Sequence, residues 1–302
     1  MITRHSIKNG FLWIDLSTPT APEINSLSEE YGFTPAISED LASPTPRPRF
    51  YEDGKLLYAI LHIPVFKHSH TSRDGQEIDF IIGRNVCITV RYENIDALYK
   101  FQKEAETQEI LGKGHLEHSH IFFNLMQEIY ATLFDELAFI EDWISSIEKK
   151  IFLGLEREMV LSISEASRTL LNFRKSTEPH KEILEFLKIT GESRFGPSFK
   201  ENMTLLLRIL DRLNQTLKNH SEMLGELRET NNSLLSTKEN EVMKTLTVLA
   251  AITIPASIIA SLFNMSVELP FANTPHEFWI ILGVMALISA SMFLFFRYKK
   301  WI

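Results

Sequence analysis

Two long uncharged segments near the C-terminus constrain this chain more than any other feature of its 302 residues. Thr245–Phe263 and Phe278–Phe296 are each 19 residues long and contain no Asp, Glu, Lys or Arg. The hydrocarbon core of a bilayer, about 30 Å thick, requires about 20 helical residues, so each segment can cross it. The sequence therefore predicts a membrane protein with a C-terminal helical hairpin.

The basic residues around these spans predict their orientation. Lys244 precedes the first span, whereas Arg297, Lys299 and Lys300 follow the second. The connecting loop, residues 264–277, contains no Lys or Arg. By the positive-inside rule, we expect a multi-pass protein of the plasma (inner) membrane with both termini in the cytoplasm and this loop outside.

The rest of the chain is acidic. The formal net charge is −8, and residues 1–239 alone carry −9. This balance argues against nucleic acid as a partner, since it lacks a basic footprint. No apolar run near the N-terminus is long enough for a signal peptide, so we expect the acidic part to stay in the cytoplasm.

Residues 1–115 are predicted to form a cytoplasmic α/β domain. β-branched and aromatic residues alternate with Pro/Gly/Ser-rich breaks, a pattern typical of strands and turns. The predicted strands are Phe11–Leu16, Leu56–Ile63, Ile78–Ile82 and Val86–Tyr92, and the predicted helices are Ala21–Tyr31 and Thr34–Leu41.

From residue 116 onward the pattern is helical. Apolar residues recur every three or four positions from Ile121 to Ile151, and a second helical stretch covers Glu156–Lys188, so residues 116–197 are predicted to form a helical hairpin. Ser198 and Glu201 have the spacing of a capping box, which predicts the start of the next helix.

That next helix, residues 198–263, is predicted to be a long stalk that continues into the first span. It is followed by the loop 264–277 and by residues 278–302, the second span with a basic tail. The stalk has a 4-3-4-3 seam typical of a coiled coil, formed by Leu206, Leu210, Leu213, Leu217, His220, Leu224, Leu227, Asn231 and Leu234. The seam favours stalks that bundle between subunits; the alternative is that it packs within one subunit.

Two spans cannot enclose a path alone, so a pore requires an oligomer around a central axis. The first span is the better pore lining, because it continues the stalk and carries hydroxyl side chains. These are Thr245, Thr247, Thr253, Ser257 and Ser261. The second span is more uniformly apolar and suits membrane lipid.

These residues resemble the CorA family of divalent-cation channels over essentially the whole chain. The segments that carry the resemblance are Trp13-Ile14-Asp15-Leu16, Arg47-Pro48-Arg49-Phe50, Phe80-Ile81-Ile82-Gly83-Arg84-Asn85, Asn240-Glu241-Val242-Met243-Lys244, Phe263-Asn264-Met265-Ser266 and Tyr298-Lys299-Lys300-Trp301-Ile302. The resemblance implies a funnel-shaped homopentamer with an α/β cytoplasmic domain and a long stalk helix. It also implies that the first span lines the pore.

The same resemblance assigns roles along the first span. Asn240 matches a cytoplasmic polar ring, Met243 and Leu246 match an apolar gate, and three further lining positions are Ile254, Ser257 and Ser261. Apolar constrictions can gate by dewetting. Ordinary helix packing is the alternative for Met243 and Leu246.

At the outer mouth the chain departs from the family. The family signature is Gly-Met-Asn, and Asn264-Met265-Ser266 stands in its place. The Asn of the signature binds an ion that keeps its water, which matters because Mg²⁺ dehydrates reluctantly. Glu268 is a candidate for an acidic collar beside this triplet. The alternative for Asn264 is a helix C-cap.

The regulatory cation sites of the family cannot be assigned to single residues of this sequence. The acidic candidates for a regulatory cation are Glu229, Asp211, Asp135 and Glu141, with a solvated helix face as the alternative for each. Histidines suit Zn²⁺ or Ni²⁺, and ordinary surface residues are the alternative for those in predicted loops, which are His68, His70, His115, His118 and His120.

The sequence thus predicts a membrane protein of the α+β class that moves Mg²⁺ or a related ion (Co²⁺, Ni²⁺, Zn²⁺). The divalent cation is its substrate and a candidate regulator, and no cofactor is expected. An enzyme is not expected, because Gly112-Lys113-Gly114 lacks the rest of a phosphate-binding loop. Two alternatives stay open, namely a Zn²⁺, Co²⁺ or Ni²⁺ transporter that works outward and a non-conducting membrane scaffold or sensor.

Overall fold

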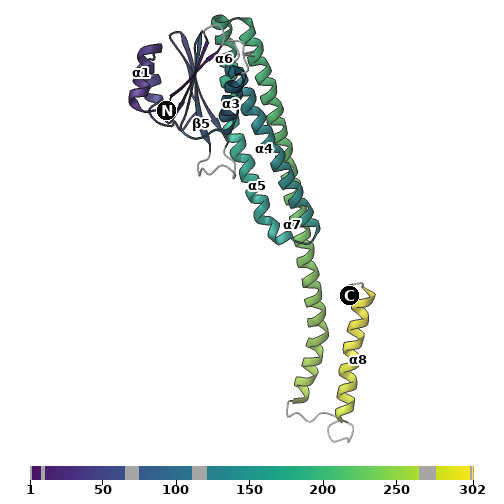
Figure 1. Ribbon diagram of the computed structural model, residues 1–302. Coiled ribbons are helices and arrows are strands. Elements are labelled where there is room, and N and C mark those ends of the chain that lie inside the picture. Colours follow the sequence, from purple (N-terminus) through teal and green to yellow (C-terminus); the bar gives the residue numbers. More distant parts are fainter. Residues whose placement is uncertain are drawn as a thin grey trace. The chain divides into compact units, whose positions relative to one another are not determined.

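The computed structural model describes residues 2–7, 11–64, 75–110, 121–264, 277–299 and 301. They belong to two compact units: the first comprises Met1–Gly154 and Glu158–Leu227, and the second Leu155–Arg157 and Arg228–Ile302. The elements (Figure 1) are β1 (Ile2–Ile7), β2 (Phe11–Ser17), α1 (Ala21–Tyr31), α2 (Pro35–Asp40), β3 (Phe50–Asp53), β4 (Leu56–Ile63), β5 (Gln76–Ile82), β6 (Val86–Arg91), α3 (Asp96–Ile110), α4 (Ile121–Phe152), α5 (Glu156–Thr177), α6 (His180–Phe195), α7 (Pro197–Asn264) and α8 (Glu277–Tyr298).

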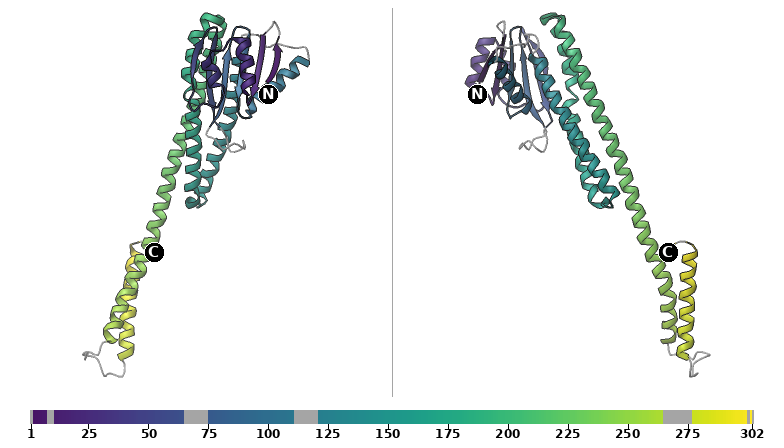
Figure 2. Two further views of the ribbon diagram at one scale, coloured as in Figure 1. Left: turned by 90° about the vertical axis from the view of Figure 1, so that its left-hand side faces the viewer. Right: turned by 45° about the vertical axis from the view of Figure 1, so that its right-hand side comes forward.

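The first unit is built on one six-stranded sheet with the order β1-β2-β6-β5-β4-β3. β2 and β6 run parallel, and the other neighbouring strands are antiparallel. Helices lie against both faces of the sheet (Figures 1 and 2). A strand buried on both faces shows a near-continuous apolar run rather than alternation, as Leu56–Ile63 does.

One face of the sheet packs against α1 and α2. Its core is apolar and buried, and includes Ile14, Leu16, Ile24, Leu27, Ile37, Leu41, Tyr58, Ile60, Ile81 and Ile88. Apolar burial of this extent, at about 25 cal/mol per Å², is the main term that stabilises such a domain.

The other face packs against α3, α4 and α6. Trp13 meets Phe101 of α3 edge-on, with ring centroids 5.1 Å apart, and Phe80 meets Phe122 of α4 at 4.9 Å. The Trp13 indole donates to Thr89 Oγ1 at 3.1 Å, so this buried ring is also satisfied as a donor.

A buried histidine joins α6 to the sheet. His180 Nε2 donates to the carbonyl of His62 at 2.9 Å, and the Tyr130 hydroxyl of α4 donates to His180 Nδ1 at 3.2 Å. Both ring nitrogens are thereby used by a neutral imidazole. Burial lowers the pKa of His180 to about 4, because the charged form would lose its hydration.

The long helices pack by the predicted spacing. From Ile121 to Ile151 the predicted apolar positions of α4 are buried. α7 lies beside α4, since Arg212 stacks over the Phe134 ring at 5.7 Å and His220 Nε2 lies 3.8 Å from Glu141 Oε2.

The heptad seam is buried inside the single chain. Six of its leucines are at most 7% exposed, namely Leu206, Leu210, Leu213, Leu217, Leu224 and Leu227. For these positions the structure shows the alternative in which the seam packs within one subunit. The preference for bundling between subunits was wrong here, because the seam faces the subunit's own helices.

Other helix boundaries differ from the prediction. The stretch Glu156–Lys188 is two helices, since α5 ends at Thr177 and α6 begins after Pro179, which cannot donate a backbone hydrogen bond. α7 begins at Pro197, so Ser198 lies inside the helix and is not its cap. Proline at the first helical position is favourable, because its missing N–H would be unsatisfied there anyway.

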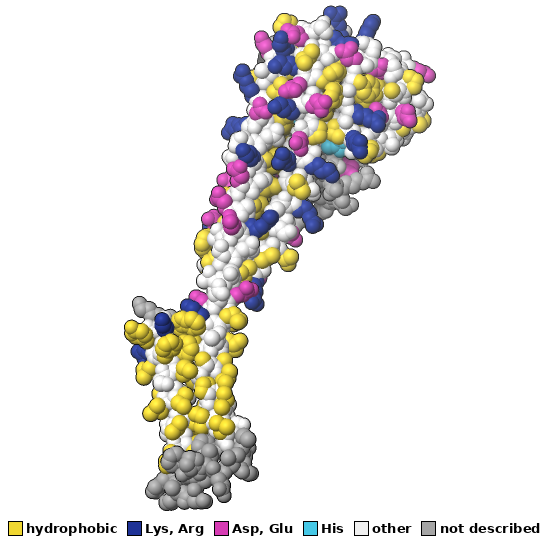
Figure 3. Space-filling view, turned by 180° about the vertical axis from the view of Figure 1, so that it is seen from behind, with side chains coloured by type: hydrophobic (Ala, Val, Ile, Leu, Met, Phe, Trp, Pro, Cys, Tyr) yellow, Lys and Arg dark blue, Asp and Glu magenta, His cyan; other side chains and the backbone are white. Residues whose placement is uncertain are grey.

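The second unit contains the later part of α7 and all of α8. Within the described residues, two helices are long and apolar enough to cross a membrane, Pro197–Leu262 and Trp279–Tyr298. In the second unit the apolar side chains of these two helices are largely exposed, whereas acidic and basic side chains cover much of the first unit's surface (Figure 3). The predicted pair of spans is thus present as two helices.

Candidate pore-lining face of helix α7

In the second unit, α7 passes through Pro255 without ending. Threonine and serine hydroxyls on either side hydrogen-bond back to the helix. Thr247 Oγ1 donates to Met243 O at 2.7 Å, and Ser257 Oγ donates to Thr253 O at 3.0 Å. Because these protons are committed to carbonyls, the hydroxyl oxygens can offer only their lone pairs to a ligand.

One face of this part of α7 packs against α8. Between Val248 and Ile259, the buried or half-buried residues fall mainly on that face, which consists of Val248, Ala251, Ile252, Pro255, Ala256 and Ile259. The half-buried residues of α8 also share one face, and these are Ile281, Met285, Ile288, Ser289, Met292 and Phe296. We call the α7 set the α8-contact face.

The predicted pore residues occupy a different face. Asn240, Met243, Leu246, Ile254, Ser257 and Ser261 are all exposed. At about 100° per residue, their mean direction lies roughly 150° around the helix from the α8-contact face. We call this set the pore stripe. It is an uncharged face that the chain does not cover with its own described side chains.

The two predicted gate residues lie at the beginning of the stripe. Met243 and Leu246 are 58% and 57% exposed and lie one turn apart on α7. Helix packing within the chain, the alternative for these residues, would require them to be buried, and they are not. Their exposure leaves them available to meet lipid or another copy of the chain.

A cation–π contact lies at one end of the unit. Lys244 Nζ lies over the Trp301 ring, 6.0 Å from its centroid. Lysine and tryptophan together are typical of the membrane–water interface. No local sequence pattern indicates that α7 and the C-terminal tail meet through this pair.

The outer-mouth residues are only partly within the described structure. Asn264 is the last residue of α7. Met265, Ser266 and Glu268 lie outside the described residues, as do His68, His70, His115, His118 and His120. Selection of the ion at this end therefore stays a prediction from the sequence.

The regulatory candidates are not brought together within the chain. Asp135 and Glu141 are exposed on α4, and Asp211 and Glu229 are exposed on α7. Among the described residues, no three carboxylate, imidazole or thiol groups could hold a metal ion together. Glu141 instead faces His220, and burial lowers the pKa of that histidine.

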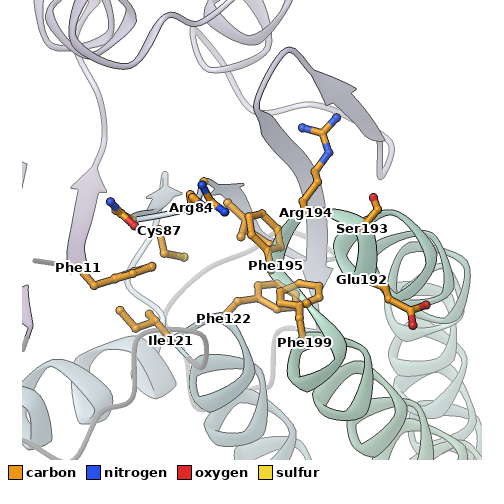
Figure 4. A pocket seen from close by; sticks show the side chains of 14 residues that line it. Phe11, Arg84, Cys87, Ile121, Phe122, Glu192, Ser193, Arg194, Phe195 and Phe199 are labelled. Carbon is orange, nitrogen blue, oxygen red and sulfur yellow. The ribbon is translucent and has the colours of Figure 1, made fainter. Parts of the chain in front are cut away.

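The first unit contains a hollow that could be mistaken for a ligand site. It measures about 680 Å³ and is lined by the ends of β2, β5 and β6, the start of α4 and the α6–α7 junction (Figure 4). Phe11, Phe122 and Phe199 in its wall are only 2–6% exposed. Arg194 is already engaged by Glu52 at 2.8 Å. These four side chains of its wall are thus packed or engaged by the protein itself.

Comparison with known proteins agrees with the resemblance seen in the sequence. The sequence profile of the family described as "CorA-like Mg2+ transporter protein" matches residues 8–300. The "Cobalt/magnesium transport protein CorA" of Methanocaldococcus jannaschii is 25% identical over 298 residues, which cover 96% of this chain and 91% of that protein. The protein of the same name from Thermotoga maritima is 25% identical over 304 residues, covering 95% and 85%.

Solved structures show the same fold. The complete structure of the CorA magnesium transporter from Methanocaldococcus jannaschii matches with a TM-score of 0.84 at 24% identity, covering 97% of this chain and 92% of that chain. The full-length CmaX protein matches with a TM-score of 0.74 at 18% identity, covering 96% and 89%. The chain therefore belongs to the family of CorA-like Mg²⁺ transporter proteins and is a divalent-cation transporter of the CorA type.

Proposed function

We propose that five copies of this chain assemble in the plasma membrane with their pore stripes facing a common axis, and that Mg²⁺ passes between them. The observation that carries the proposal is the position of the stripe. It is exposed along α7 and lies away from the α8-contact face. An uncovered stripe that carries an amide and hydroxyls between apolar side chains is better matched to water and a shared axis than to lipid.

The chemistry of the stripe suits a hydrated cation. Mg²⁺ dehydrates reluctantly and usually keeps several waters. Those waters point their hydrogens outward. The serine and threonine hydroxyls already donate to backbone carbonyls, so their oxygens are free to accept hydrogen bonds from these waters. Met243 and Leu246 would form apolar rings near the cytoplasmic end, where loss of water closes the path.

The driving force requires no cofactor. A divalent cation that enters down a membrane potential of 100 mV, negative inside, gains about 4.6 kcal/mol, at about 2.3 kcal/mol per charge. Inward flux therefore follows from the potential alone. Both termini, with the basic residues Lys244 and Arg297, lie on the cytoplasmic side in this proposal.

A matched pair of serines tests which helix lines the path. Ser257 of α7 and Ser291 of α8 are both exposed, and both hydroxyls bond back to a backbone carbonyl. In liposomes loaded with an ion-sensitive dye, we expect Ser257→Phe to abolish most Mg²⁺ influx. In a pentamer the substitution would place five phenylalanine rings, one from each subunit, around the path and narrow it. Ser291→Phe should leave influx near wild type. Equal fluxes through both variants would refute the assignment.

The preferred ion is tested at the outer mouth. Wild type and the double variant Asn264→Gly/Ser266→Asn are compared for Mg²⁺, Co²⁺, Ni²⁺ and Zn²⁺ influx in the same liposomes. Mg²⁺ flux through wild type means that Asn264 and Ser266 form a working substitute for the family signature. Flux of Co²⁺, Ni²⁺ or Zn²⁺ alone, with Mg²⁺ flux regained in the double variant, identifies a transporter for those ions; efflux from preloaded vesicles tests its direction.

The second candidate is a non-conducting scaffold or sensor, favoured by the replaced signature. It predicts correctly assembled oligomers that pass none of the four ions in either variant. In both cases the exposed carboxylates remain candidates for sites shared between subunits, where a divalent cation would regulate; they are Asp135, Glu141, Asp211 and Glu229.

A further inference from the structure

The turn between α4 and α5 presents large apolar side chains to its surroundings. Phe152, Leu153 and Leu155 are 67%, 77% and 38% exposed. Gly154 between them has φ of 91°, a left-handed conformation that glycine adopts without strain. The backbone is therefore built to make this turn. Grouped, exposed apolar side chains mark a contact with a partner or a membrane.

The turn is attached to α7 by the residue that starts α5. In the second unit, Asn231 Nδ2 donates to the Glu156 carbonyl at 3.1 Å, and Lys238 Nζ lies 2.6 Å from Glu156 Oε2. Glu156 is 4% exposed and Asn231 is 1% exposed. The hydrogen bond from Lys238 holds the pKa of Glu156 below its usual value, so this carboxylate stays charged at neutral pH.

This attachment lies close to the membrane surface. The Lys244–Trp301 contact marks the interface, and Lys238 precedes Lys244 by six residues, or about 9 Å along a helix. The headgroup layer adds roughly 5–7 Å to each side of the hydrocarbon core. Phe152 is four residues from Glu156, a chain length of up to about 14 Å. The apolar side chains of the turn are thus within reach of the headgroups.

We propose that the α4–α5 turn, Phe152–Leu155, is a membrane contact: Phe152 and Leu153 enter the headgroup layer of the bilayer that α7 and α8 cross. The inference rests on the membrane placement of α7 and α8 proposed above. The charged residues that flank the turn nearly balance, and they are Glu148, Lys149, Lys150, Arg157 and Glu158. The contact is therefore apolar, and it does not depend on anionic lipid.

Site-directed fluorescence in the full-length protein tests this contact. The only native cysteine, Cys87, is buried, so wild type serves as the labelling blank. Leu153→Cys carries a small fluorophore in nanodiscs, with Leu171→Cys on α5 and Leu287→Cys on α8 as matched controls. All three leucines are strongly exposed, at 77%, 64% and 72%. The quenchers are a nitroxide on the lipid headgroup, a nitroxide at mid-chain and aqueous iodide.

The proposal predicts that the headgroup nitroxide quenches the probe at Leu153 most strongly. The probe at Leu287 should respond chiefly to the mid-chain nitroxide, and the probe at Leu171 only to iodide. Nanodiscs of zwitterionic lipid and of mixed anionic lipid should give the same loss of emission at Leu153.

Each other outcome overturns a distinct statement. If Leu287 is quenched at mid-chain but Leu153 responds only to iodide, the turn lies in water and the inference fails alone. If no quencher reaches Leu153, another subunit covers the turn, which also refutes the lipid contact. If Leu287 escapes the mid-chain nitroxide, the membrane placement of α8 fails, and the proposed function fails with it.

Discussion

The two parts of helix α7 treat the same amino acid in opposite ways. Leu213, in the first unit, is wholly buried, whereas Leu246, in the second, is 57% exposed. In the first unit, the apolar side chains of the sheet and of the helices pack mostly against one another. In the second unit only the α8-contact face is covered. The chain thus covers most apolar side chains of the first unit itself, whereas it leaves most of those of the second unit exposed.

The sharpest test of this contrast exchanges these two leucines for alanine. Leu213→Ala leaves a cavity in a closed core and should reduce the free energy of unfolding by about 2–5 kcal/mol. Leu246→Ala should leave the thermal unfolding of the detergent-solubilised protein unchanged but alter cation flux in liposomes. Equal loss of stability in both variants would mean that α7 is packed alike along its length.

Acid should weaken the first unit through His180. Its folded pKa, about 4, lies below the ordinary value of about 6.5. The unfolded chain therefore binds a proton first, and stability is lost as pH falls from 6.5 to 4, by about 3 kcal/mol at most. Chemical unfolding of wild type and His180→Gln across this range isolates the effect, since the variant should lack this slope.

The buried carboxyl of Asp79 acts in the opposite direction. Burial and the neighbouring Glu77 raise its pKa, so its contribution to stability grows as pH falls. Because Asp79 is present in both proteins, it cancels in the difference between wild type and His180→Gln. A difference that does not change between pH 6.5 and 4 would refute the buried neutral histidine.

Glycine gives the smallest of the three tests. A Cβ on Gly191 would overlap the Phe199 ring, whose nearest atom would lie 2.2 Å away, whereas nothing lies within 4 Å of a Cβ on Gly283 of α8. Gly191→Ala should destabilise the first unit by about 1–3 kcal/mol through overpacking. Gly283→Ala should be neutral or stabilise α8 by up to about 1 kcal/mol. Thermal unfolding of both variants in detergent distinguishes the two surroundings.

Much of the fold was predictable because short stretches of the sequence carry the residue patterns of its helices and strands. α1 is confirmed at Ala21–Tyr31, and β4 at Leu56–Ile63. The central strands are apolar on both faces, so their runs are unmistakable. β1 was not predicted, because Ile2–Ile7 mixes polar, basic and apolar residues and becomes a strand only by pairing with β2 at the sheet edge.

The candidate site was predictable to a different degree. The assignment of Asn240 to Ser261 to a pore came from the family resemblance and stays a prediction, and the structure places these residues on an exposed face of α7. The sequence did not predict the hydrogen bonds of Glu156 with Asn231 and Lys238, which lie 75 and 82 positions away. No local pattern encodes such a long-range hydrogen bond. The same applies to the seam, whose periodicity identifies a buried face but not whether the partner is the same chain or another copy.

The uncharged stretch from Thr245 to Phe263 has a consequence for the rate at which an ion would pass along it. An ion that meets no fixed opposite charge over some nineteen residues has no deep energy well in which to linger, and fast passage depends on short dwell times. A wall of this kind discriminates weakly among cations of equal charge. In a path lined by this helix, recognition of the ion belongs to the two ends, and the long middle section serves turnover.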